Sequence, residues 1–138
     1  MSRNKGKRGE REVVKLLQPV VNAVYEEFGL EPPLIERNLM QSNRGGYDLV
    51  GLNWVGLEVK LQEQENLSSW WKQCKEQCNE DQEPVLFYRR NRVAWKVQMF
   101  GFLVAGEHRV RAPVVISVEA FLAYLKIRLR MELSNLQS

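Results

Sequence analysis

The spacing of apolar residues along the chain predicts three helices. Between residues 10 and 28 apolar side chains recur every three to four positions, as they do along one face of an α-helix. Gly29 fits the C-terminal cap of that helix, whereas Pro19 should bend the helix or restart it. Two further helices are predicted at residues 67–79 and 118–133, the last with Ser117 as its N-terminal cap.

The segments between these helices have the composition and alternation of β-strands. The predicted strands cover residues 34–40, 47–52, 55–61, 85–88 and 93–100. The second and third are close enough to form a hairpin, and Gly101 and Gly106 predict turns within the less regular stretch 101–112. The order of elements predicts one α/β domain over residues 1–138, with a central mixed β-sheet of about five strands flanked by helices. Residues 1–9 form a basic N-terminal arm in this interpretation.

The last predicted helix has an apolar arc wider than packing on one sheet requires. One stripe contains Phe121 and Leu125, and a second contains Tyr124, Ile127 and Met131. Either the helix is deeply buried, or it is shared with a second subunit. We expect a homodimer, and this helix is the candidate for its seam.

Composition excludes several classes of protein. Of the 138 residues 44% are hydrophobic and 27% are charged, which is ordinary for a globular domain and argues against a disordered or collagen-like chain. No run of 18 apolar residues predicts a membrane span, and no apolar segment follows the basic N-terminus as in a secretory signal. Cys74 and Cys78 alone do not make a disulfide framework. We therefore expect a cytoplasmic protein, in the host cytoplasm if the chain is viral, with no membrane partner.

Positive charge is concentrated at the N-terminus. The first eleven residues carry five basic side chains against Glu10 alone, namely Arg3, Lys5, Lys7, Arg8 and Arg11. Such a cluster favours contact with the phosphates of a nucleic acid, although a solvated tail would have the same composition.

The predicted strand 55–61 carries the chemistry. Because side chains alternate along a strand, Glu58 and Lys60 share one face, and Asp48 on the adjacent strand can approach Glu58. Two neighbouring carboxylates repel each other, and a divalent cation compensates that repulsion. Oxygen ligands suit Mg²⁺, so we expect a magnesium site on Asp48 and Glu58, with the Val59 carbonyl completing the protein ligands.

Glu10 lies at the angular centre of the apolar stripe of the first helix, which aims it at the same region, so we expect it as a further ligand of the metal. It could instead complement the dipole of the first helical turn. Lys60 could likewise form only a salt bridge to one of the carboxylates.

These residues together resemble the PD-(D/E)XK nuclease superfamily. The matching pieces are Gly46–Val50 around Asp48 and the Glu58-Val59-Lys60 triplet. The opening Lys5-Gly6-Lys7-Arg8-Gly9-Glu10-Arg11-Glu12 is similar to that of archaeal-type Holliday junction resolvases, a type we also expect in phages. The similarity covers about residues 5–90. Tyr47 stands where the superfamily name has proline.

The resemblance implies an active site made of Glu10, Arg11, Arg37, Asp48, Glu58 and Lys60. Ser42 corresponds to the serine before the aspartate in that family, and Arg44 is an alternative for the place of Arg37 or Ser42. The implied activity is Mg²⁺-dependent hydrolysis of phosphodiester bonds, with Mn²⁺ as a substitute, in branched DNA bound as a four-way junction. The alternatives are a nuclease acting on linear, branched or single-stranded DNA, an RNA-processing nuclease, or a catalytically dead DNA-binding module.

Overall fold

The computed structural model describes residues 2–39 and 47–137, with side chains from Gly6 onward. The elements are α1 (Ser2–Glu27), β1 (Glu36–Arg37), β2 (Leu49–Val50), β3 (Val55–Leu61), α3 (Leu67–Glu76), β4 (Glu83–Arg89), β5 (Lys96–Ala105), β6 (His108–Ser117) and α4 (Val118–Gln137). The strands form one open sheet in the order β1-β2-β3-β4-β5-β6. The pair β3–β4 is parallel and every other neighbouring pair is antiparallel. The expected mixed α/β sheet is confirmed, with six strands instead of about five.

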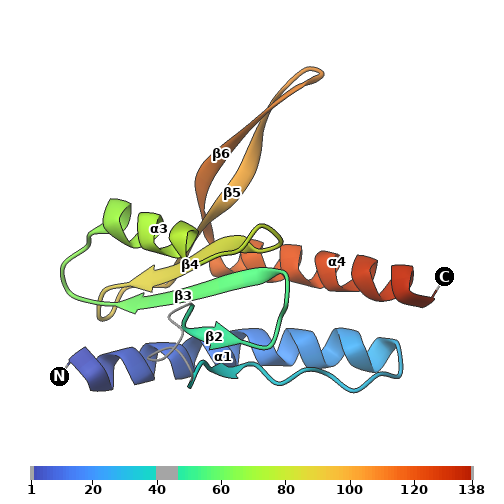
Figure 1. The fold of residues 1–138 in the computed structure, drawn as a ribbon, viewed down its shortest axis with the longest axis horizontal. Coiled ribbons are helices and arrows are strands. Elements are labelled where there is room, and N and C mark those ends of the chain that lie inside the picture. Colours follow the sequence, from blue (N-terminus) through green and yellow to red (C-terminus); the bar gives the residue numbers. More distant parts are fainter. Residues whose placement is uncertain (1, 40–46, 138) are drawn as a thin grey trace.

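The helices cover the two faces of the sheet (Figure 1). Apolar residues of α1 and α4 pack against one face, where Leu57 and Phe87 are among the buried strand residues. On the other face α3 packs Trp70, Trp71 and Cys74 against β4. Side-chain alternation along β3 therefore sends Leu57 toward α1 and its neighbour Glu58 toward α3.

Helix α1 starts earlier than the hydrophobic pattern predicted. It begins at Ser2 and runs through Pro19 without interruption to Glu27, so residues 2–9 are helical and do not form an extended arm. The amides of Gly29 and Leu30 donate to the carbonyls of Glu26 and Tyr25, respectively, at 3.0 Å each. Gly29 has a φ of +67°, which glycine adopts without strain, and this confirms the predicted C-terminal cap.

The first two predicted strands are much shorter in the structure. Each is reduced to two residues, and Met40 with residues 41–46 lies outside the described residues. Strand β3 matches the predicted range 55–61, and it pairs with β2 as the predicted hairpin. The second helix ends at Glu76, and the last extends to Gln137 with the Ser117 hydroxyl accepting from the amide of Ala120 at 3.1 Å.

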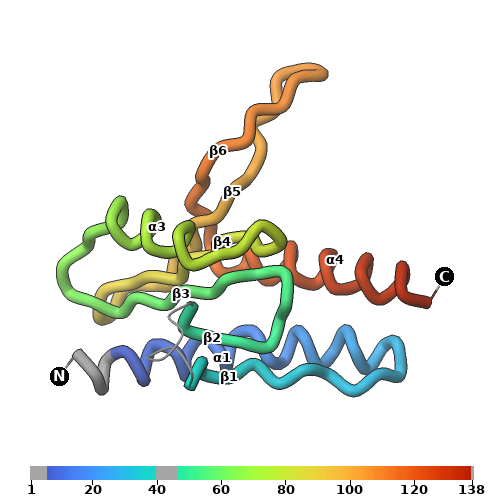
Figure 2. Tube along the Cα trace, viewed as in Figure 1, coloured from blue at the N-terminus to red at the C-terminus, as the bar shows by residue number. Residues whose placement is uncertain are grey.

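Residues 96–117 form a long hairpin, and this corrects the prediction of a turn at Gly101. Gly101 lies inside β5 opposite Ala112, whereas Gly106 lies in the turn with a φ of +60°. The hairpin rises from the sheet and projects beyond the helices (Figures 1 and 2). We call its outer part, residues 101–112, the hairpin arm.

No helix among the described residues is long and apolar enough to cross a membrane.

Candidate active site

Glu58 is the most unusual residue of the sheet. It lies in the middle of β3, faces α3, and is 1% exposed. Neither of its carboxylate oxygens accepts a hydrogen bond from the described residues. A buried carboxylate without donors is costly, so this position calls for a proton or a cation that is not part of the chain.

Asp48 is held beside Glu58 by the β2–β3 hairpin. Its amide donates to the Leu57 carbonyl and its carbonyl accepts from the Asn38 amide, both at 2.9 Å. The Asp48 carboxylate accepts from the Val59 amide at 2.8 Å. The amide and carbonyl of a strand residue point to the same edge, so the Val59 carbonyl also faces this edge of β3. The structure thus brings together three of the expected ligand groups.

Glu10 approaches the same place from α1. It is 9% exposed, and the Arg37 guanidinium donates to its carboxylate at 2.5 Å. Burial raises the pKa of Glu10 against the effect of this hydrogen bond, and the Asp48 carboxylate raises it further. The ion pair joins the start of the chain to β1 and places Arg37 within the cluster.

The electrostatics of the cluster are dominated by Glu58. Burial first, and then the Asp48 carboxylate, raise the pKa of Glu58 to about 9, while Lys60 opposes the shift and Glu10 adds to it. With no cation bound, Glu58 is therefore protonated at neutral pH and can donate to Asp48. Lys60 follows on the same face of β3, near enough to favour the ionised form of Glu58.

The donor set fits a hard cation. No group of three histidine, cysteine or acidic side chains among the described residues is arranged to hold a metal ion. Mg²⁺, however, is commonly bound by one or two carboxylates together with water and substrate phosphate. Asp48, the Val59 carbonyl and the donor-free oxygens of Glu58 provide such a set. Glu10, bonded to Arg37, is better placed as a neighbouring group than as a direct ligand.

The structure places the expected phosphate-binding residues in different surroundings. Lys7 is half-buried and acts electrostatically on Glu10, and Arg11, one helical turn later on α1, is exposed. Arg8 instead donates to Asn91 at 2.6 Å and lies 3.6 Å from the Glu12 carboxylate. The side chains of Arg3 and Lys5, together with Ser42 and Arg44, lie outside the described residues.

The hydrophobic pattern gave no sign of a second charged cluster, centred on Glu12. The Arg89 guanidinium donates to both Glu12 oxygens at 2.7 and 2.9 Å, and the Trp95 indole donates at 3.0 Å. This cluster fastens α1 to the end of β4. The only signal in the sequence was the acidic residue within the basic segment, which does not reveal its distant partners.

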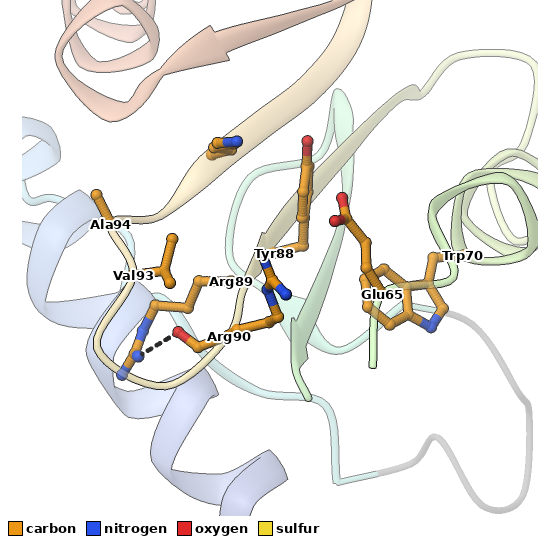
Figure 3. A pocket seen from close by; sticks show the side chains of 8 residues that line it. Glu65, Trp70, Tyr88, Arg89, Arg90, Val93 and Ala94 are labelled. Carbon is orange, nitrogen blue, oxygen red and sulfur yellow. Dashed lines mark hydrogen bonds between the residues drawn. The ribbon is translucent and has the colours of Figure 1, made fainter. Parts of the chain in front are cut away.

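A small pocket lies between Trp70, Tyr88 and the turn after β4 (Figure 3). Tyr88, one of its lining residues, is the β4 register partner of Lys60, but Lys60 itself does not line the pocket. Its volume of about 30 Å³ holds water but no nucleobase. Trp70 is 6% exposed and packs 6.2 Å from the Tyr88 ring, which makes it a core residue. The lining consists of Glu65, Trp70, Tyr88, Arg89, Arg90, Val93, Ala94 and Lys96.

Comparison of the chain with protein-family models, with curated protein sequences and with solved structures finds no match.

Proposed function

We propose that this protein is a Mg²⁺-dependent, structure-selective DNA endonuclease that resolves four-way junctions. The observation that carries the proposal is the buried Glu58 carboxylate beside Asp48, because neither Glu58 oxygen has a donor among the described residues. A carboxylate placed in this way, next to a second acid and a lysine, is suited to hold a cation and poorly suited to stabilise a fold.

The order of elements supports the assignment to the PD-(D/E)XK superfamily. Asp48 precedes β2, Glu58 and Lys60 lie on β3, and Glu10 reaches them from the preceding helix. The opening motif, the aspartate and the Glu58-Val59-Lys60 triplet therefore converge on one region. Chance matches to such short motifs would not be expected to meet in space.

Each residue has a role in hydrolysis. Bound Mg²⁺ would supply Lewis-acid activation of water and of the scissile phosphate. Asp48 and Glu58 would hold the ion, and Lys60 would orient the attacking water or neutralise charge on the phosphate. Arg37 holds the Glu10 carboxylate in position and opposes the rise of its pKa that burial causes. Lys7 and Arg11 would bind the DNA backbone on the same helix that carries Glu10.

The substrate follows from charge and symmetry. Contacts between basic side chains at the start of α1 and phosphates carry no sequence information, so we expect recognition of backbone shape. A four-way junction is resolved by two cuts related by a two-fold axis, and two copies of a chain with one such site would provide them.

The decisive experiment compares labelled four-way junction, splayed and linear duplex DNA, each with Mg²⁺ and with EDTA. We expect paired cuts in the junction with Mg²⁺ only, Mn²⁺ acting as a substitute. Cleavage that persists in EDTA would contradict the metal assignment. Equal cleavage of linear duplex would contradict structure selectivity, and binding without cleavage of any DNA would indicate a dead module.

A further inference from the structure

A row of three side chains crosses the sheet at the level of Lys60. The register places Lys60 of β3 opposite Tyr88 of β4, and Tyr88 opposite Lys96 of β5. Residues that lie opposite one another in neighbouring strands share a face of the sheet, here the face that also carries Glu58. Neighbouring strands are about 4.8 Å apart, so Lys96 lies about 10 Å from Lys60 across the sheet. The row leads from the candidate site to the start of β5.

Arg90 lies next to this row, in the turn that follows β4. Figure 3 shows its side chain beside Tyr88, whereas the neighbouring Arg89 points away to the other side, where it binds Glu12 of α1. Arg90 and Lys96 are both exposed, and both line the small pocket beside Tyr88. Among the described residues no acidic group forms an ion pair with either of these two cations. The fold itself therefore leaves two positive charges uncompensated at this place.

Two hydrogen bonds hold the turn in place. The Val93 amide donates to the Arg90 carbonyl at 3.1 Å, which closes the turn on itself. Arg8 donates to the Asn91 side chain at 2.6 Å, which fastens the turn to the basic start of α1. A cation carried by a fixed backbone loses less freedom on binding than one on a mobile loop. The turn is therefore prepared to bind an anion beside α1.

We propose that Arg90 and Lys96 bind backbone phosphates of the DNA strand that leaves the candidate site, so that this strand runs across β4 toward the start of β5. The inference rests on the proposed function and adds the path of the substrate to it. One strand of duplex DNA carries a phosphate about every 3.4 Å along the helix axis. The distance of about 10 Å between Lys60 and Lys96 therefore corresponds to about three nucleotides.

The pocket between these residues favours a phosphate over a base. Its volume of about 30 Å³ has room for about two water-sized groups, such as phosphate oxygens. Trp70 packs on Tyr88 and is 6% exposed, so its ring face is not free to stack on a base. Glu65 is the acidic member of the lining, and after burial it is the second cause that raises the pKa of Tyr88. Its charge should oppose the binding of a phosphate.

The first test measures DNA affinity in EDTA, where no cleavage is expected. Arg90→Ala combined with Lys96→Ala should lower the slope of log affinity against log salt by about 1.4–1.8, and weaken binding at 0.15 M salt about 20-fold. Arg109→Ala combined with Lys126→Ala removes the same charge from the hairpin arm and α4, and should leave the slope nearly unchanged. Glu65→Gln should strengthen binding about twofold or more. All variants should keep the circular dichroism of the wild type, because these side chains are exposed.

The second test locates the contact on the DNA. Methylphosphonate linkages, which are neutral, are placed one at a time along one strand of a four-way junction near the branch point. At the contacted position the linkage should weaken binding of the wild type about fivefold, but should have little effect on the Arg90→Ala, Lys96→Ala double variant. Losses that add at every position would overturn the inference, because no phosphate would then be coupled to these residues.

The outcomes separate this inference from the proposed function. An unchanged salt slope in the double variant, an equal change in the control variant, or weaker binding by Glu65→Gln would overturn the inference, even if the junction is cleaved normally. A protein that shows the coupled phosphate in EDTA but cleaves no DNA with Mg²⁺ would instead support the inference and contradict the nuclease assignment.

Discussion

Glu10 and Glu12 are separated by one residue on α1, yet their surroundings differ completely. Glu12 receives donors from Arg89 and from the Trp95 indole, so its charge is fully compensated. Glu10 accepts a hydrogen bond from Arg37, and Lys7 adds a weaker favourable charge. Against these, burial and the Asp48 carboxylate raise the pKa of Glu10, and Glu10 in turn raises the pKa of Glu58.

The comparison separates a structural carboxylate from a functional one. A cluster in which bases match acids stabilises the contact between two elements. A cluster with an excess of buried acids is unfavourable without a cation, and such arrangements concentrate at functional sites. Substitution of Glu12 should therefore change the stability of the protein, whereas substitutions in the Glu10 cluster should change its activity.

The largest expected effect is on catalysis. Asp48→Asn should reduce junction cleavage by about 10²–10³-fold or more while DNA binding persists, because one charge of the cluster is lost and the phosphate contacts remain. Single-turnover cleavage and a binding titration measure both quantities. Glu12→Gln is the matched control and should cleave normally at a temperature where it is folded. Near-normal turnover of Asp48→Asn at saturating Mg²⁺ would refute its role.

The second effect is on stability. Glu12→Ala should lower the free energy of unfolding by about 2–3 kcal/mol, because Arg89, with a side chain only 12% exposed, loses its charged partner. Denaturant unfolding followed by circular dichroism measures this change. Glu27→Ala, which removes an exposed ion pair with Arg130, is the control and should cost clearly less. Equal costs would mean that the Glu12 cluster is no more than a surface contact.

The third effect depends on pH. The pKa of Glu58 is about 9 in the folded chain against an ordinary value of 4.5, so the folded state holds this proton more tightly. The resulting stabilisation is complete below pH 4.5 and is lost as the pH rises toward 9. Glu58→Gln, which cannot ionise, should therefore become more stable than wild type as the pH rises.

In EDTA, the difference in melting temperature between Glu58→Gln and wild type should grow by at least about 3–5 °C between pH 5 and pH 9, which corresponds to about 1 kcal/mol. Glu12→Gln is the comparison variant, with no such growth expected. A difference that stays constant across this range would contradict a buried, protonated Glu58.

The smallest expected effect is on DNA affinity. Lys7→Ala combined with Arg11→Ala should lower the slope of log affinity against log salt by about 2, one for each lost phosphate contact. Arg8→Ala should change the slope less, because Arg8 is engaged by Asn91 and Glu12. Fluorescence anisotropy at several salt concentrations measures the slopes, and an unchanged slope in the double variant would remove Lys7 and Arg11 from the DNA interface.

Local features of the chain were predictable because neighbouring residues determine them. The alternation along residues 55–61 identified β3 and placed Glu58 and Lys60 on one face. Gly29 and Ser117 marked the end of α1 and the start of α4, because a cap requires only backbone groups within a few residues. The candidate carboxylates were visible for the same reason.

Long-range partners were decided only by the tertiary structure. The pairing of Glu10 with Arg37 and of Glu12 with Arg89 depends on which distant segments the sheet brings together, and no local pattern records it. The length of the hairpin arm could not be predicted from the sequence either. Gly101 taken alone predicts a turn, but it lies opposite Ala112 within the hairpin. The sequence by itself determined which residues could carry chemistry and where its helices end. Packing decided which acids are compensated, because compensation requires partners from elements that are far apart in the chain.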